Sequence, residues 1–262
     1  MTVRVPAVAG SFYPGQEETL RHELDGLIPA ARKERVVAAI APHAGYVYSG
    51  AVAAAAYVRA AKLSGRIRRV VLLGPAHRAF LRGLAAPRAD AFATPLGVVP
   101  IERKAIDALI DLPQLEVSDA PHAGEHCLEV QLPFLQCVLG EFRLVPLVVG
   151  DASDEEVQEV IERLWGGEET LLVVSSDLSH YHDHAAARQI DAASCRAIEA
   201  LEPSRLGRDS ACGVVPVRGL LCAARRLGLV ARTLDLRNSG DTAGGRERVV
   251  GYGAWSFQAP TR

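Results

Sequence analysis

This sequence of 262 residues has no long apolar run and no large excess of charge of one sign. No run approaches the roughly 20 apolar residues needed to cross a bilayer. The first ten residues, MTVRVPAVAG, hold no apolar stretch of the kind a signal peptide requires, so we expect none. The formal net charge is only -2, with neither a basic stripe nor an acidic tail. We therefore expect no nucleic-acid partner and no membrane partner.

Cysteine is scarce and shows no pairing pattern. The five cysteines form an odd count without a C-x-x-C, which argues against a disulfide framework and against a zinc knuckle. We therefore expect reduced thiols in a cytoplasmic protein. The signatures G-x-G-x-x-G, Walker A and G-x-S-x-G are also missing, so dinucleotide binding, NTP binding and a serine-hydrolase elbow have no support.

The chain is 49% hydrophobic and 23% charged, which at this length suits one large α/β domain over residues 1–262. Continuous apolar runs predict strands covered on both faces, at residues 36–41, 68–74, 142–150 and 169–176. Helical patterns alternate with them, at residues 49–65, 153–167, 183–201 and 213–229. Further strands are predicted within residues 83–102, 229–239 and 246–258. The alternation predicts a three-layer αβα sandwich with a mixed, mostly parallel central sheet.

Three of the predicted strands lead into segments that carry a histidine. His43 lies in APHAGY, His77 in GPAHR, and Asp177 and His180 in SSDLSHY. In open α/β sheets, ligands bind outside the carboxyl ends of the strands. Three histidines at equivalent places favour a metal or catalytic site over three unrelated loop histidines. Two imidazoles suit iron, copper, zinc or nickel.

A third ligand stays open at this point. Cys212, in DSACGVVPV, stands just before a predicted helix start. There the helix dipole would lower the pKa of the thiol and favour the thiolate. The alternative is that Cys212 is a small buried apolar residue.

Residues 120–140 hold a second polar cluster, at the start of a predicted core-facing helix. The apolar stripe of that helix is Leu128, Leu132, Leu135 and Leu139. HAGEH matches the zinc-peptidase pattern H-x-x-E-H. However, Pro121 and Gly124 place His122 before the helix, and no downstream acidic ligand follows. We expect instead that Glu125 and His126 line the pocket, with a solvated helix start as the alternative.

Seven motifs, in order along nearly the whole chain, resemble those of the Memo protein family. They are RVPAVAGSFYP, APHAGYVYSG, LLGPAHR, EHCLEVQLPFL, VVSSDLSHY, DSACGVVPV and SGDTAGG followed by VVGYGAW. In prokaryotes such proteins are known as AmmeMemoRadiSam system protein B, from a gene set that also includes a radical-SAM enzyme. The family fold is similar to that of class III extradiol dioxygenases, the LigB-like non-haem iron enzymes.

The resemblance implies a metal site. Its ligands would be His43, His77 and Cys212, which match the positions that bind metal in the eukaryotic relative. The metal would be iron, as Fe(II), or copper. Dioxygenases of similar fold use two histidines and one carboxylate, so Cys212 departs from their ring-cleaving pattern.

The resemblance also implies pocket and catalytic residues. His180 and Asp177 match catalytic pocket positions, with His180 as a general acid or base assisted by Asp177. Glu125, His126 and Cys127 match the E-H-S motif of the family, with Cys127 in place of the usual serine.

Three functions stay open from the sequence. The first is a non-haem iron or copper redox enzyme, dioxygenase-like, acting on a small-molecule or peptide ligand. The second is a non-catalytic adaptor that binds metal or peptide in a vestigial pocket. The third is a metal-dependent hydrolase that uses zinc on the same ligands. The gene set further predicts a functional link to a radical-SAM enzyme.

Overall fold

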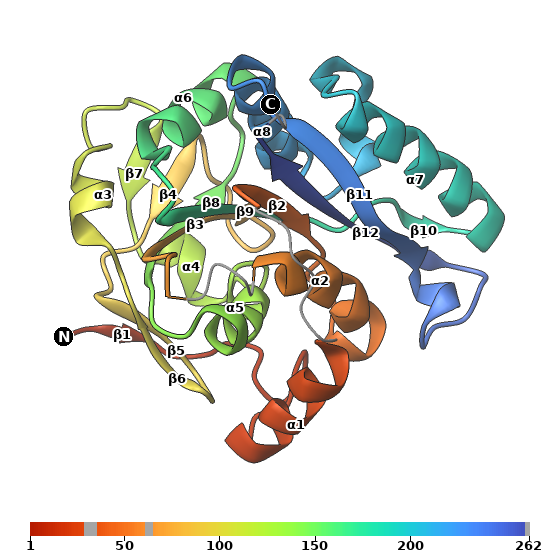
Figure 1. The fold of residues 1–262 in the computed structure, drawn as a ribbon, viewed down its shortest axis with the longest axis horizontal. Coiled ribbons are helices and arrows are strands. Elements are labelled where there is room, and N and C mark those ends of the chain that lie inside the picture. Colours follow the sequence, from red (N-terminus) through yellow and green to blue (C-terminus); the bar gives the residue numbers. More distant parts are fainter. Residues whose placement is uncertain (29–35, 61–64, 260–262) are drawn as a thin grey trace.

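The computed structural model describes residues 1–28, 36–60 and 65–259, and a mixed β-sheet runs through its centre (Figure 1). Within these residues the sheet has nine strands, in the order β10-β12-β2-β9-β3-β8-β4-β7, with β11 paired to β12. Its central strands are β2 (Ala38–Ala41), β9 (Thr170–Ser175), β3 (Arg69–Pro75) and β8 (Arg143–Val149). Its outer strands are β12 (Val249–Gln258), β11 (Val230–Asn238), β10 (His180–His182), β4 (Leu84–Ala86) and β7 (Leu115–Val117).

The four central strands are parallel to one another, whereas β12 and β4 run antiparallel to their inner neighbours. Every residue of β2 and β9 is buried, as is all of β3 and β8 beyond their first residues. Both faces of these strands are therefore covered, which explains why their sequences are continuous apolar runs. The predicted mixed sheet is confirmed, with its parallel part at the centre.

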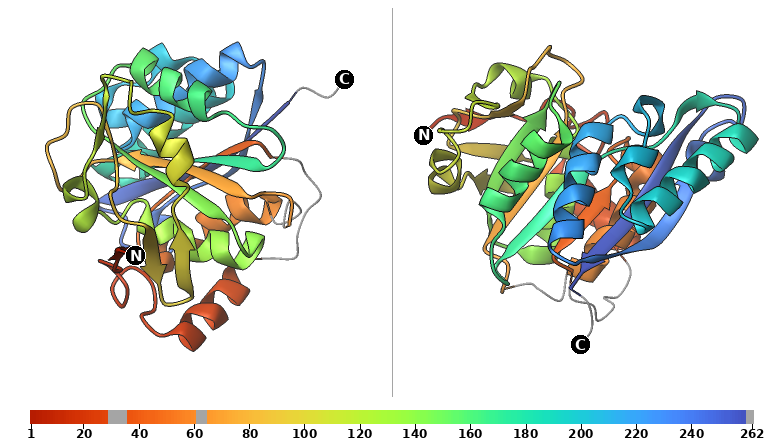
Figure 2. Two further views of the ribbon diagram at one scale, coloured as in Figure 1. Left: turned by 90° about the vertical axis from the view of Figure 1, so that its left-hand side faces the viewer. Right: turned by 90° about the horizontal axis from the view of Figure 1, so that it is seen from above.

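Helices cover the two faces of the sheet and complete the αβα sandwich (Figures 1 and 2). One face carries α6 (Asp154–Leu164), α7 (His184–Glu199) and α8 (Val214–Arg226). The other carries α1 (Glu17–Leu27), α2 (Tyr46–Ala60) and α5 (Leu132–Leu139). The helix α6 begins where the sequence predicts, because Ser153 and Glu156 form a capping box.

A small second sheet lies beside the main one. It consists of β1 (Val3–Arg4), β5 (Ala91–Thr94) and β6 (Gly97–Pro100), in the order β1-β5-β6, so β6 is an edge strand. The short helices α3 (Arg103–Asp107) and α4 (Ala120–Ala123) complete the described elements of four residues or more. Among the residues described, no helix has the length and apolar character needed to cross a membrane.

The prediction of one helix within residues 120–140 is wrong in the length of that helix. Only α4 and α5 are α-helical there, and a loop and a short 3₁₀ turn, Glu129–Gln131, separate them. Pro133 occupies the first turn of α5, where proline is tolerated because no amide donor is needed. Proline within a longer helix would remove a hydrogen bond, so α5 starts late. The break leaves the stretch after α4 free to turn its polar side chains toward the strand ends.

The carboxylate of Glu129 ties the first residues of the chain to this loop. Its side chain is fully buried and accepts hydrogen bonds from the amides of Ala7 (2.7 Å) and Val8 (3.0 Å) and from the Tyr13 hydroxyl (2.7 Å). The Arg4 guanidinium lies 2.5 Å from the same carboxylate. Arg4 also donates to the carbonyl of Glu125. A buried charge is tolerated only with such partners, so this pairing fixes the N-terminal segment against the loop.

Replacing Glu129 tests this anchor. We expect Glu129→Gln to lower the free energy of unfolding by about 3 kcal/mol or more, because Arg4 would keep a buried charge without its partner. Urea denaturation followed by circular dichroism measures the change. The matched control is Glu17→Gln, since the Glu17–Arg21 pair is exposed and should contribute under about 0.5 kcal/mol. Equal stabilities of the two variants would refute the anchor.

Candidate functional site

Three histidine rings meet at the carboxyl edge of the parallel strands. His43 follows β2, His77 follows β3, and His126 comes from the loop after α4. The ring centroids are 5.1 Å apart for His43 and His77, 5.3 Å for His43 and His126, and 4.8 Å for His77 and His126. One ligand nitrogen from each ring lies within 4.8 Å of the others. Because β2 and β3 flank β9 in parallel, the strand-end rule places two of these rings side by side.

A buried carboxylate, that of Glu125, orients the His77 ring and lies 3.2 Å from Nδ1 of the His126 ring. It accepts from the backbone amide of His77 (2.7 Å) and from His77 Nδ1 (3.0 Å). It also accepts from the amides of His126 (2.9 Å) and Cys127 (3.0 Å). Burial alone would raise the pKa of this carboxyl, but the His126 and His77 rings and the Cys127 amide hold the pKa well below its usual range. An ionised carboxylate only accepts, so His77 donates from Nδ1, and in the neutral ring Nε2 is the nitrogen that carries the lone pair.

A second hydrogen-bond chain fixes the tautomer of His43. The Gln131 amide nitrogen donates to the Pro42 carbonyl (2.9 Å) and to Ser175 Oγ (2.7 Å). Ser175 in turn gives its only proton to the carbonyl of Cys127, at 2.6 Å. Ser175 Oγ can then only accept from His43 Nδ1, which lies 3.0 Å away. His43 is therefore protonated on Nδ1, and its Nε2 carries the lone pair.

The thiol of Cys212 faces this lone pair. Cys212 Sγ lies 3.2 Å from His43 Nε2 and also accepts from the amide of Asp177, at 3.3 Å. Burial, followed by the charge of Asp177, raises the pKa of the Cys212 thiol to about 12. The predicted lowering of this pKa by the helix dipole is wrong, because desolvation of the thiolate outweighs the N-terminus of α8. In the described chain, the three-histidine cluster contains His126 and does not include Cys212.

Asp177 and His180 lie beside the cluster but serve different contacts. Asp177 is buried and accepts from the backbone amide of His43, at 2.8 Å. Burial raises the pKa of its carboxyl, although the hydrogen bond from His43 opposes the rise. His180 Nδ1 lies 2.8 Å from the Leu178 carbonyl, which can only accept. The His180 ring is thus oriented by the Leu178 carbonyl rather than by Asp177, and Nε2 is the ring nitrogen left for other contacts.

Two hollows reach the site and share Cys212 as a wall. One, of about 640 Å³, is bordered by His180 and Tyr181. The other, of about 240 Å³, has an apolar lining that includes Phe80 and Leu81. Neither hollow is lined by His43, His77 or His126, so both adjoin the cluster through Cys212, behind which His43 is buried.

Cys127 lies beside His77 and Glu125, with their ligand atoms within 4.8 Å of its sulfur, whereas His122 is packed elsewhere. Cys127 is buried, and its thiol donates to the Pro75 carbonyl at 3.2 Å. Its sulfur fills the space beside Gly74, where a Cβ would lie 2.6 Å from it. His122 is also buried, with Nε2 3.0 Å from the Ala85 carbonyl. The H-x-x-E-H pattern therefore does not form a joint site, since His122 and His126 serve different surroundings.

Several residues that shape the site did not stand out from the sequence. Ser175, Gln131 and Arg4 act through buried hydrogen bonds to the loop or to His43. Of these residues, Gln131 is the easiest to recognise from the sequence, because it is the one polar residue in the apolar stretch VQLPFL. A buried amide of this kind needs partners, which in this protein are in the site.

Comparisons with known proteins agree with this architecture. The sequence model of the family described as Memo-like protein matches residues 4–256. The chain belongs to the Memo family. A MEMO1 family protein of Aquifex aeolicus is 38% identical over 266 residues, which cover 96% of this chain and 98% of that protein. Another from Methanosarcina barkeri is 36% identical over 269 residues, with the same coverage.

A solved structure is similar in fold alone. The crystal structure of the uncharacterized protein JW3007 from Escherichia coli K12 has a TM-score of 0.50 and 13% sequence identity. The match covers 84% of this chain and 99% of that one. It agrees with the predicted α/β architecture of a Memo-like chain.

Replacing Glu125 tests whether its carboxylate orients the His77 ring. We expect Glu125→Gln to weaken metal binding by about 10- to 100-fold, because the amide no longer fixes His77 with its Nε2 lone pair exposed. Competition against a chromophoric chelator measures the affinity. The control is Glu116→Gln, at an exposed position on β7. An affinity equal to that of the unchanged protein would rule out the orienting role.

The buried His122 predicts loss of stability in acid. Burial lowers the pKa of His122 from 6.5 to about 4, so between these values the unfolded chain binds more protons than the folded one. Stability should fall by about 3 kcal/mol as the pH drops through this window. The measurement is the free energy of unfolding of the protein and of His122→Gln from pH 7 to pH 4. The difference between the two should shrink toward low pH, and a constant difference would contradict the prediction.

Proposed function

We propose that this Memo-family protein is a non-haem metal redox enzyme that uses iron or copper on a small-molecule or peptide substrate. The observation that supports it is the convergence of three imidazoles beside one thiol, that of Cys212, which also borders a hollow. Imidazole suits iron and copper, and a sulfur donor favours copper(I) or a redox-tuned iron.

The donor atoms fit such a metal. In their neutral forms His43 and His77 would both present an Nε2 lone pair, because each donates a hydrogen bond from Nδ1–H, to Ser175 and Glu125 respectively. These two residues would hold the ion, with Cys212 as the third ligand that the family resemblance implies. His126 is a fourth donor within reach. When bound, the metal would supply one-electron chemistry and a place for dioxygen.

The residues around the donors would orient substrate and move protons. His180 would act as general acid or base through Nε2, since its Nδ1 proton is held by the Leu178 carbonyl. Asp177 would position His43 through the backbone amide. The apolar hollow next to Cys212 would exclude water from one side of the substrate.

A zinc hydrolase is the second candidate function. The specific observation in its favour is the all-histidine cluster, because three imidazoles with an open position are a common zinc set in catalytic sites. Cys212 would then lie beside the metal, its thiol protonated, rather than bind it. The third ligand therefore separates the two enzymatic proposals.

Metal content tests the proposal first. We expect near-stoichiometric iron or copper in protein purified anaerobically, and its loss in His43→Ala/His77→Ala, measured by mass spectrometry of the metals. His22→Ala, at an exposed position on α1, is the control and should retain the metal. Oxygen consumption by the loaded protein then tests redox turnover. Zinc alone would favour the hydrolase, and no metal would favour an adaptor that binds a ligand without turnover.

Two further variants identify the third ligand. Cys212→Ser should lower the metal content and change the visible spectrum of the copper or iron form, because the sulfur donor is lost. His126→Ala should do so only if the third donor is an imidazole. An unchanged metal content in Cys212→Ser would count heavily against the redox proposal.

A further inference from the structure

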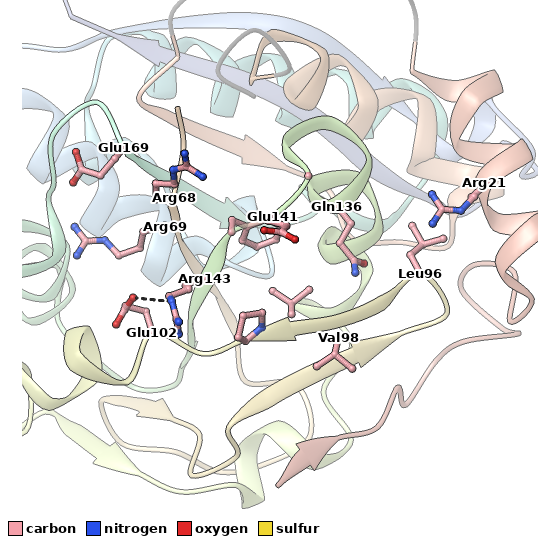
Figure 3. Close-up of a pocket in the computed structure, with 14 residues that line it drawn as sticks. Arg21, Arg68, Arg69, Leu96, Val98, Glu102, Gln136, Glu141, Arg143 and Glu169 are labelled. Atoms are coloured by element: carbon pink, nitrogen blue, oxygen red, sulfur yellow. Dashed lines mark ion pairs between the residues drawn. The ribbon is translucent and has the colours of Figure 1, made fainter. Parts of the chain in front are cut away.

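A hollow lies at the amino ends of the central strands, the opposite end of the sheet from the histidines, and Figure 3 shows the residues that line it. Its volume is about 860 Å³, which is within the range of small-molecule sites. It is bordered by residues at the amino ends of β3, β8 and β9, and by the hairpin of β5 and β6. Four arginines line it, namely Arg21, Arg68, Arg69 and Arg143.

Two of these arginines are available to an anion. Arg69 is engaged, because its guanidinium donates to Thr170 Oγ1 (3.1 Å) and to the Leu164 carbonyl (3.2 Å). Arg143 stands opposite Arg69 on the neighbouring strand, so two like charges adjoin. Its only ion pair with a described residue is a long one, 3.6 Å to Glu102, and its side chain is 58% exposed. The guanidinium of Arg68 has no hydrogen bond or ion pair to any residue that the structure describes.

The glutamates of the hollow neutralise these charges only in part. Glu169 turns its carboxylate to the Gly167 amide and the Thr170 hydroxyl, both at 3.2 Å. Glu102 faces Arg143 at the distance given above. Glu141 is exposed at the middle of the hollow and forms no ion pair with the residues drawn in Figure 3. Arg68 and Arg143 therefore lack a close anionic partner.

The hairpin supplies an apolar wall to the same hollow. Leu96, Val98, Val99 and Pro100 border it from the turn and from β6, and Phe142 borders it from the loop before β8. Val98 is 50% exposed on the edge strand. A ligand that covers this wall would remove apolar surface from water as it meets the arginines.

We propose that this hollow binds a phosphate monoester with an apolar or aromatic body. Arg68 and Arg143 would hold the phosphate, whose three oxygens and nearly double charge can serve two guanidinium groups at once. A carboxylate has fewer oxygens and a single charge, so it would form fewer charge-assisted hydrogen bonds with two guanidinium groups. The body of the ligand would lie along Val98 and Phe142. The site is independent of the metal cluster, since it lies at the other end of the strands.

The test is isothermal titration calorimetry of the full-length protein with phenyl phosphate, inorganic phosphate and benzoate. We expect phenyl phosphate to bind most tightly. Arg68→Gln/Arg143→Gln should weaken it about tenfold or more, because charge-assisted hydrogen bonds are lost. Glu141→Gln should tighten it about twofold or more, because a repelling charge is removed. Arg226→Gln, an exposed arginine on α8, is the matched control and should bind unchanged.

Two further measurements keep the test decisive. His43→Ala should bind phenyl phosphate as the unchanged protein does, and loss of binding there would assign the phosphate to the histidine site instead. In NMR spectra of the unchanged protein, phenyl phosphate should shift the methyl resonances of Val98. This measurement does not require that any variant folds. No binding at millimolar concentration, or equal binding by Arg68→Gln/Arg143→Gln, would overturn the proposal. Benzoate as tight as phenyl phosphate would overturn the choice of phosphate.

Discussion

The buried pairing of Glu129 with Arg4 is the constraint on which the histidine site depends. A carboxylate with no exposure must collect hydrogen bonds, and Glu129 collects them from Arg4, Tyr13 and two backbone amides. Arg4 also donates hydrogen bonds to the carbonyls of His122 and Glu125. The loop that carries His126 is thereby held between the first strand of the chain and the main sheet. The N-terminal segment is thus part of the scaffold of the site.

The site combines rigid strand ends with carbonyl and carboxylate acceptors that decide tautomers. Parallel strands bring His43 and His77 to one edge, but a ring at the right place can still present the wrong nitrogen. Glu125 and Ser175 remove this freedom, because each accepts a hydrogen bond from an Nδ1–H. Both acceptors are buried, so their hydrogen bonds do not compete with water. The fold therefore directs Nε2, rather than Nδ1, of both rings away from these acceptors.

The sequence predicted the sheet and the strand-end residues because both follow from local patterns. Apolar runs identify the buried strands, and the polar residues that end them must reach one edge. The loop of Glu125 and His126 was harder, since an apolar stripe from Leu128 to Leu139 predicts one helix and conceals the break before Pro133. The pairing of Arg4 with Glu129 joins residues 125 positions apart in the chain, which no local pattern reveals. The helix α1 was also missed, although its buried residues Leu20 and Leu24 are four residues apart.

The contact between Cys212 and His43 bears directly on how a metal could enter. His43 is protonated on Nδ1, so in the S–H···N contact at 3.2 Å the thiol is the donor and Nε2 the acceptor. A cation needs this same lone pair, and it therefore has to displace the thiol proton or turn the Cys212 side chain away. In the first case the thiol proton would pass to solvent, and the resulting thiolate would be available as a ligand to the ion. In the second case Cys212 would not bind the ion, and His126 would be the third donor within reach. Whether a bound cation would have a sulfur ligand or imidazole ligands alone therefore depends on the proton of this contact.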